Sequence, residues 1–102
     1  MSDEPAIAVV LHAPNEVALQ RARNNAANLE QASPDAQIEI VVNAGGVAAA
    51  LSQSHPTDRL LVFCRNTLDN TGQEAGPGAT VVPSAVLHLV ERQRDGWAYI
   101  RS

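Results

Sequence analysis

The stretch LLVFCRNTL, residues 60–68, decides the fold that this sequence predicts. Its first four residues are large and apolar, and a short run of this kind is typical of a strand buried on both faces. Cys64 follows the run directly, and the segment RNTL has the composition of a turn that leads into a helix. The stretch therefore predicts a thiol at the carboxyl end of a buried strand, where α/β proteins bind ligands and place reactive groups.

Four other segments of the chain predict strands. Residues 6–11 form a continuous apolar run, and residues 38–42 become continuously apolar after an alternating start. Residues 79–82 and 97–100 are short segments rich in β-branched or aromatic side chains, which favour strands. The alternating start of 38–42 indicates a strand that begins near an edge or at an exposed end, and 97–100 indicates a strand exposed on one side.

The segment after residue 14 predicts a long amphipathic helix. Asn15 is a suitable N-cap, and Glu16 lies where the positive end of the helix dipole favours an acid. Polar residues, Arg23 among them, lie mostly off the apolar stripe, and Pro34 ends the helix because it cannot continue the hydrogen-bond pattern. The stripe, at spacings of three and four, consists of Leu19, Ala22, Ala26 and Leu29.

Two short helical segments are predicted in the middle of the chain. Residues 47–51 are rich in alanine, and the pattern turns Val47, Ala50 and Leu51 toward the core. A single helical turn is expected after Asn66, through Asp69, because Asn66 and Asp69 have the spacing of a capping box.

The last predicted helix follows the fourth strand. Pro83 suits its first turn, where a missing N–H costs nothing, and Gly96 suits the left-handed position that ends a helix. The inner face is predicted to consist of Val86, Leu87, Val90 and Gln93.

Strands therefore alternate with helices along the whole sequence. This order predicts an α/β fold with a parallel or mostly parallel five-stranded sheet that is covered on both faces. The length of 102 residues, 45% of them hydrophobic, suits one domain over residues 1–102 with one core.

Charge and cysteine content exclude several classes of function. The net charge is −4 and the sequence contains no lysine, so we expect no binding to nucleic acid or to an anionic membrane surface. A single cysteine cannot form an internal disulfide or a cysteine-based metal site. The acidic start, MSDEP, lacks the pattern of a secretory signal, and no apolar run is long enough to cross a bilayer. These features predict a cytoplasmic protein.

The candidate site lies where the first three strands end. His12 follows the first strand, residues 43–46 follow the second, and residues 64–67 follow the third. Carboxyl ends of parallel strands meet at one edge of a sheet, so these segments are expected to converge. The candidate residues are Cys64 as the reactive group and His12, Asn43, Gly45, Gly46, Arg65, Asn66 and Thr67 as binding residues.

Each of these residues also has a purely structural interpretation. Cys64 could act as a thiolate nucleophile or sulfur carrier, its charge stabilised by a helix terminus with help from Arg65 or His12, or it could pack as a small apolar side chain. His12 could tune the thiol or transfer a proton, or only hydrogen-bond at the strand end. Gly45 and Gly46 permit a positive φ and a close backbone approach; a tight turn is favoured over a phosphate loop, because no Walker or GxGxxG pattern accompanies them.

The remaining motifs favour no further chemistry. His55 has no partner near it in the sequence, and His88 with Glu91 is better explained as a solvated helix face than as part of a metal site. Ser84 follows a proline and lacks the flanking glycines of a nucleophile elbow. No metal and no cofactor is predicted.

Taken together, these residues resemble the short, uncharacterised branch of the DsrE/DsrF-like proteins. The most specific features are the cysteine followed by Asn-Thr-Leu and the ending Gly-Trp-Ala-Tyr-Ile. The resemblance extends nearly from end to end, over the first strand with His12, AANL at 26–29, IEIVV at 38–42 with the glycine turn and Val47, CRNTL at 64–68, PG at 77–78 to VP at 82–83, and RQ at 92–93 to GWAYI at 96–100.

The resemblance implies a three-layer α/β/α sandwich and a homo-oligomer, often a trimer or hexamer. In the sulfur-relay members a cysteine near this topological position carries a persulfide, and Cys64 matches that position. The chain departs from the branch at Asn43-Ala44, where relatives often have His-Gly, and in its shorter connection over residues 51–59.

Two functions follow as hypotheses. In the first, Cys64 accepts sulfane sulfur from a donor protein and passes it to an acceptor, a carrier role that is transferase-like at most, with His12, Asn43 and the N–H groups of Asn66 and Thr67 stabilising the anion. In the second, the chain is a non-enzymatic oligomeric module that binds a small ligand or a protein segment, and Cys64 is structural.

Overall fold

The computed structural model of the chain describes residues 6–102, and the acidic segment 1–5 lies outside the described residues. None of the described helices has the length and apolar character needed to cross a membrane. The strands are β1 (Ala8–Ala13), β2 (Gln37–Val42), β3 (Leu61–Cys64), β4 (Thr80–Val82) and β5 (Ala98–Arg101). The helices are α1 (Glu16–Ala32), α2 (Gly45–Ser52), the 3-10 turn η1 (Asp58–Leu60), α3 (Arg65–Thr71) and α4 (Ala85–Arg94).

The strands form one five-stranded sheet in the order β4-β3-β2-β1-β5. Every neighbouring pair is parallel, so the predicted α/β fold with its parallel sheet is confirmed. β2 lies in the centre between β1 and β3, so it does not begin near an edge, but its first residue, Gln37, is exposed, in agreement with the alternative of an exposed end. Within the alternating start, Glu39 faces α4, where it accepts a hydrogen bond from Arg92 and contacts His88.

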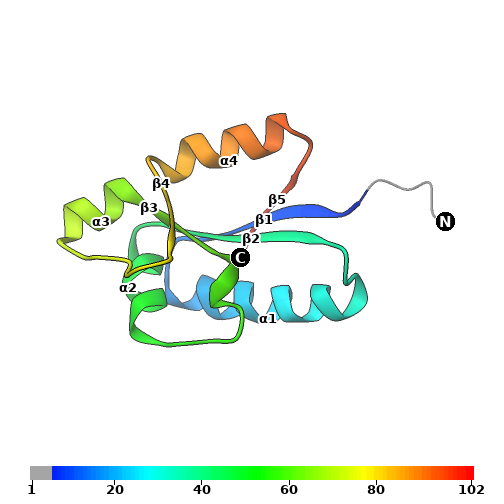
Figure 1. Ribbon diagram of the computed structural model, residues 1–102, viewed down its shortest axis with the longest axis horizontal. Helices are drawn as coiled ribbons and strands as arrows, with labels where there is room; N and C mark the ends of the chain where they lie inside the picture. The colour runs from blue at the N-terminus through cyan, green and yellow to red at the C-terminus, as the bar shows by residue number, and fades with distance from the viewer. Residues whose placement is uncertain (1–5) are drawn as a thin grey trace.

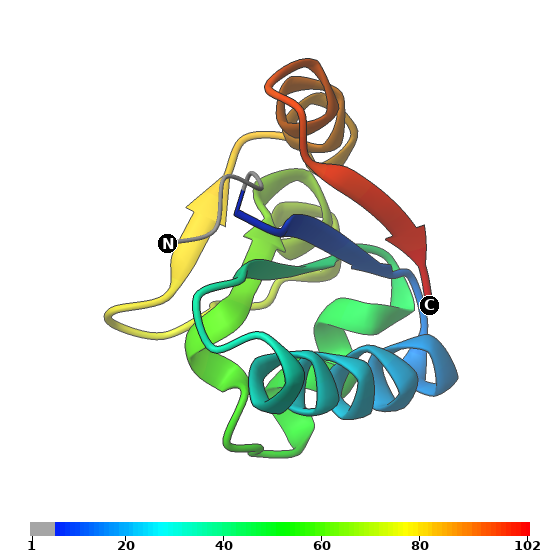
Figure 2. The same cartoon turned by 90° about the vertical axis from the view of Figure 1, so that its right-hand side faces the viewer.

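The helices cover both faces of the sheet and complete the three-layer α/β/α sandwich (Figures 1 and 2). Below the sheet in Figure 1, α1 and α2 pack on one face, and α4 lies on the other. The larger core cluster joins α1 and α2 to alternate strand residues such as Leu11, Ile40 and Phe63. The smaller cluster joins α4 to the opposite side chains of the same strands, Val10, Val41, Val62 and Cys64.

Helix α1 agrees with the prediction at its ends and differs in its middle. The Asn15 side chain accepts a hydrogen bond of 2.8 Å from the N–H of Ala18, which confirms the N-cap. Arg23, however, does not lie on the solvent side of the helix and is only 4% exposed. Its guanidinium donates to the Gln53 carbonyl at 2.7 Å and pairs with Asp58 at 3.0 Å. A carboxylate distant in the sequence thus makes it possible to bury this charge.

Two details of the short helices were predicted wrongly. Leu51 is 37% exposed although its neighbours Val47 and Ala50 on α2 are buried. Helix α3 begins two residues earlier than expected, so Cys64 is its N-cap residue and Asn66 does not cap it. The segment 65–71 is a helix of two turns, and the predicted capping box is absent there.

Helix α4 packs with a different face from the predicted one. Val86, Leu87 and Val90 are 66%, 52% and 56% exposed, whereas Ala85 and Leu89 are its buried residues. The N-cap is Ser84, so Pro83 precedes the helix and does not lie in its first turn. Apolar periodicity alone predicted that Val86, Leu87 and Val90 face inward. Ion pairing with Glu39 instead turns the His88 side of the helix to the sheet.

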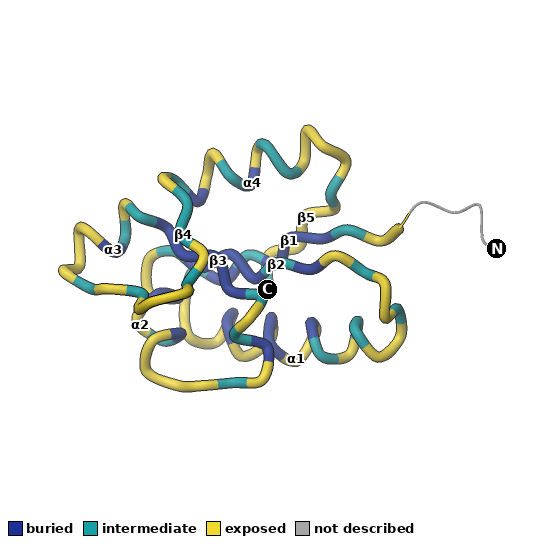
Figure 3. The backbone as a smooth tube through the Cα atoms, in the orientation of Figure 1, coloured by how far each residue is buried: buried dark blue, intermediate teal, exposed yellow. Residues whose placement is uncertain are grey.

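Strand β5 is an edge strand whose four residues are all exposed, so the expectation of one covered side was wrong. It pairs with β1 alone, with Tyr99 beside Val10 and Ile100 beside Leu11. Figure 3 shows the contrast along the sheet: buried residues are concentrated in β1, β2 and β3, and β5 is exposed.

Candidate functional site

The candidate residues lie at the carboxyl edge of the sheet, but in two separate groups. His12 lies inside β1, one residue before its end, because this strand runs two residues beyond the predicted limit. Asn43 follows β2, and Cys64 is the last residue of β3. β2 lies between the other two strands, and among the described residues no hydrogen bond joins His12 to Cys64.

The first group consists of His12, Asn43 and Tyr99. Nδ1 of His12 lies 2.7 Å from the Tyr99 hydroxyl, and Nε2 lies 2.9 Å from Oδ1 of Asn43. A neutral imidazole with its proton on Nε2 satisfies both contacts, since it donates to the amide oxygen and accepts from the phenol. The expected meeting of His12 with Asn43 does occur in the structure.

Tyr99 is a member of this group that sequence reasoning did not single out as a site residue. It comes from β5, the strand most distant in sequence, and its register beside Val10 directs it to the same side of the sheet as His12. The only signal was its place in the ending Gly-Trp-Ala-Tyr-Ile, which carried the family resemblance.

The turn after β2 is tight, and Gly46 and Ala44 contribute to it in different ways. Gly46 must lack a side chain, because a Cβ there would lie 2.0 Å from the carbonyl oxygen of Ala13. The positive φ expected at the glycines falls on Ala44 instead, at 46°. Gly45 and Gly46 are the first residues of α2. The turn brings the N–H of Ala44 to 3.1 Å from the hydroxyl oxygen of Thr67, which connects β2 to the second group.

The second group surrounds Cys64, which is 5% exposed and belongs to the core cluster beneath α4. Its sulfur accepts a hydrogen bond of 3.4 Å from the N–H of Ala85, the first residue of α4. Burial raises the pKa of the Cys64 thiol, but hydrogen bonds from the Thr67 N–H, the Ala85 N–H, the Thr67 hydroxyl and the Asn66 N–H together hold it below its usual value. These donors favour a thiolate, or another sulfur anion, at this position.

The other candidates near Cys64 have different surroundings. Asn66 is exposed and contributes through its backbone N–H. The Arg65 guanidinium lies 3.6 Å from the Asp69 carboxylate, with both side chains largely exposed, so its charge is already paired along the surface of α3. Three or more His, Cys, Asp and Glu side chains do not gather into a metal-binding group anywhere in residues 6–102.

The other two histidines have partners that the sequence did not reveal. His88 is not on a solvated face with Glu91: its Nε2 lies 2.8 Å from the Glu39 carboxylate, and its side chain is 13% exposed. His55 lies within its own loop, with Nδ1 2.8 Å from the Thr57 hydroxyl.

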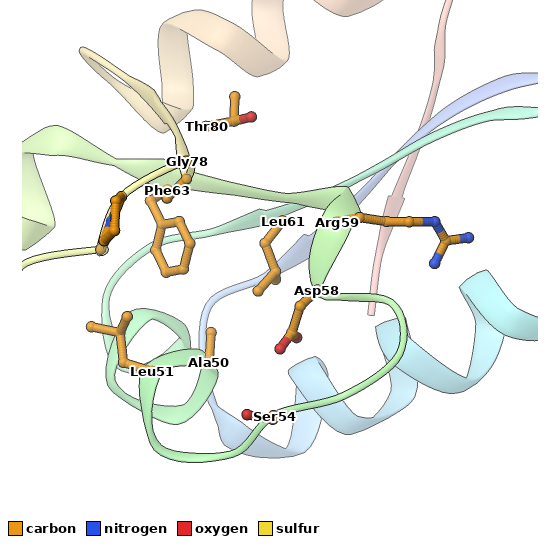
Figure 4. A pocket seen from close by; sticks show the side chains of 12 residues that line it. Ala50, Leu51, Ser54, Asp58, Arg59, Leu61, Phe63, Gly78 and Thr80 are labelled. Carbon is orange, nitrogen blue, oxygen red and sulfur yellow. The ribbon is translucent and has the colours of Figure 1, made fainter.

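A cavity of about 400 Å³ opens on the other side of the sheet from Cys64 (Figure 4). Leu61 and Phe63 of β3 form its floor, Ala50 and Leu51 of α2 form one wall, and the segment around Gly78 lies across from them. Alternation along β3 explains the separation, because Phe63 and Cys64 point to opposite faces. Sequence reasoning did not predict this cavity, which depends on where the segment before β4 crosses the sheet.

No family model matches this chain, and no curated protein matches it. Among solved structures it is similar to a protein of unknown function, MTH1491 from Methanobacterium thermoautotrophicum. The two share 28% sequence identity with a TM-score of 0.75, over 94% of this chain and 99% of that chain. The similarity supports the α/β fold over nearly the whole length.

Proposed function

We propose that this chain is a cytoplasmic, homo-oligomeric protein of the DsrE/DsrF-like type that carries sulfane sulfur as a persulfide on Cys64. The observation that carries the proposal is the set of donors around Sγ. The N–H of Ala85 lies 3.4 Å from the sulfur, and the Thr67 hydroxyl and the N–H groups of Asn66 and Thr67 help to hold the pKa of the thiol below its usual value. Such donors stabilise the anionic sulfur species that a carrier must hold both before and after loading.

The loading step is a thiol–disulfide type of exchange. The Cys64 thiolate attacks the outer sulfur of a donor persulfide, and a new S–S bond forms at Cys64. The S–S bond of the donor breaks, and its electron pair leaves with the inner sulfur as a thiolate. The outer sulfur keeps its proton, no net oxidation occurs, and release to an acceptor thiolate is the same exchange in reverse.

The outward face of α4 supports the homo-oligomer in this proposal. Val86, Leu87 and Val90 lie on the side of the helix opposite Ala85 and Leu89, and each is more than half exposed. Large apolar side chains grouped on one exposed helix face are typical of a protein interface.

A second candidate is the oligomeric binding module in which Cys64 is structural. The burial of Cys64, 5% exposed, favours it, since a free cysteine in a core commonly serves only to pack. In this case Sγ of Cys64 only accepts the hydrogen bond from the Ala85 N–H at the start of α4, and it exchanges no sulfur with another protein.

Mass spectrometry after incubation with a low-molecular-weight persulfide distinguishes the two. A carrier gains one sulfur atom at Cys64, the addition is removed by a reducing thiol, and Cys64→Ser does not gain it. A protein that takes up no sulfur under these conditions, while a small thiol in the same tube does, has a structural cysteine. The control variant is Ser52→Ala, at an exposed residue of α2 on the other face of the sheet, which keeps the thiol and the donors around it.

A further inference from the structure

The start of helix α4 packs against Cys64 on one side of the sheet, and Cys64 is only 5% exposed. Cys64 packs in one cluster with Ala85 and Leu89 of α4 and with Val62 beside it in β3. The N–H of Ala85 closes over the sulfur at 3.4 Å. A donor molecule that approaches Sγ from this side of the sheet therefore meets α4 first.

Helix α4 buries few apolar side chains against the sheet. Of its ten residues, Ala85 and Leu89 are buried, and the first of these has a side chain of one carbon. On the opposite face, α1 buries Ala18, Leu19, Ala22, Arg23 and Ala26 over 17 residues. Since apolar burial contributes roughly in proportion to area, α4 is held much less firmly by packing than α1 is.

An ionic anchor replaces the missing apolar contacts. The Glu39 carboxylate, on the central strand β2, accepts two hydrogen bonds from Arg92, from Nε at 3.0 Å and from a terminal nitrogen at 2.9 Å. It also contacts Nε2 of His88 at 2.8 Å. The Arg92 guanidinium in turn lies 4.5 Å from the centre of the Trp97 ring, which ties the end of α4 to the start of β5.

We propose that α4 is a cover over Cys64 that Glu39 holds closed, and that reagents reach the sulfur when α4 lifts from the sheet while the α1 side of the fold stays intact. The biological meaning of this opening, controlled access of a sulfur donor to Cys64, rests on the proposed function. The physical basis is that proteins open in parts, and the part with the least buried apolar surface opens at the lowest free energy. The contacts of Glu39 are then the main resistance to opening.

The test measures the rate at which iodoacetamide alkylates Cys64 at neutral pH in native protein. Glu39→Gln is expected to raise this rate about tenfold, and Arg92→Gln, a second variant should the first fold poorly, is expected to raise it similarly. The two changes alter net charge in opposite directions, so an electrostatic effect on the thiolate would move the two rates apart. Hydrogen exchange at the Ala85 amide should accelerate in both variants, with the α1 amides unchanged.

The matched control is Asp58→Asn, which changes charge as Glu39→Gln does and breaks a buried ion pair with Arg23 on the other face. It should leave the alkylation rate within about twofold of the parent. If the rates of all variants follow their global free energies of unfolding, access requires complete unfolding and the proposal is overturned. Persulfide loading of the same samples distinguishes the cover from the carrier function. Faster alkylation without any loading would contradict the carrier function and would still support α4 as a cover over Cys64.

Discussion

At Gly46 the structure leaves no room for a side chain. A Cβ there would meet the Ala13 carbonyl oxygen at 2.0 Å, and this oxygen belongs to the backbone of β1, which cannot move aside. Gly46→Ala should therefore destabilise the protein by about 2–3 kcal/mol or more, as overpacking of a rigid site does. Urea unfolding checks this, with Gly45→Ala as the matched control. At Gly45 the nearest atom is 3.5 Å away, and a change beyond about 1 kcal/mol there would contradict the steric explanation.

Ala44 stores backbone strain in the same turn. It has a φ of 46° and a ψ of −133°, a combination that glycine adopts far more easily than alanine. Ala44→Gly is expected to stabilise the protein by about 1 kcal/mol, because the strain disappears while the N–H stays in place for Thr67. Ala49→Gly, within the regular part of α2, should instead destabilise by about 1 kcal/mol. Equal losses of stability in the two variants would show that Ala44 is not strained.

Thr67 is the residue through which the turn after β2 acts on the thiol. Its oxygen accepts from the Ala44 N–H, so its own hydrogen is free to donate to the sulfur. Thr67→Val should raise the pKa of Cys64 and slow its alkylation at neutral pH roughly two- to fivefold, since one hydrogen bond contributes about 1 kcal/mol. The pH profile of alkylation measures this. Thr67→Ser keeps the hydroxyl and should have the same pH profile as the parent. Equal shifts of the profile in Thr67→Val and Thr67→Ser would rule out the hydroxyl as the cause.

At the scale of the elements, the attachment of α4 to β2 depends on one carboxylate. Burial raises the pKa of Glu39, but its contacts with Arg92 and His88 hold it below the ordinary value of 4.5. A lowered pKa means that the stability contributed by Glu39 is fully present above its unfolded pKa and is lost as the pH falls through its folded pKa. We therefore expect α4 to loosen in acid.

Unfolding of the parent and of Glu39→Gln across pH 3–7 checks this expectation. The variant should be about 1–3 kcal/mol less stable at neutral pH, and the difference should shrink as the pH falls below about 4, where the parent carboxylate also becomes neutral. Glu30→Gln, at the surface pair with Arg59, provides the comparison and should cost less than about 1 kcal/mol. A difference that stays constant across the whole pH range would contradict the assignment to Glu39 ionisation.

At the scale of the whole molecule, the outward face of α4 and the edge strand β5 both expose large apolar side chains. We expect light scattering on a sizing column to show an oligomer, in keeping with the proposed homo-oligomer. Leu87→Glu combined with Val90→Glu should yield a monomer with unfolding unchanged within about 1 kcal/mol, because both side chains are more than half exposed. Val17→Glu, at a residue 60% exposed on α1, should leave the oligomer intact. A monomeric parent at micromolar concentration would refute the interface.

The sequence was a good guide to the order and type of the elements. Continuous apolar runs predicted the buried strands, alternation with helical stripes predicted the parallel sheet, and Asn15 marked the start of α1 correctly. These signals are local, so each can be recognised without knowing what packs against it. The same local logic placed His12 beside Asn43 and Cys64 at a strand end.

Ion pairs and strand pairing between residues far apart in the sequence decided the features that local sequence patterns did not predict. Arg23 is buried because Asp58 reaches it, and α4 presents Ala85 and Leu89 to the sheet because Glu39 draws His88 and Arg92 inward. Tyr99 meets His12 only through the register of β5 on β1. The sequence by itself determined a thiol at the end of a buried strand. The tertiary structure decided that this thiol lies beneath α4 with the Ala85 N–H directed at its sulfur, since Ala85 is 21 residues away along the chain and only folding brings it there.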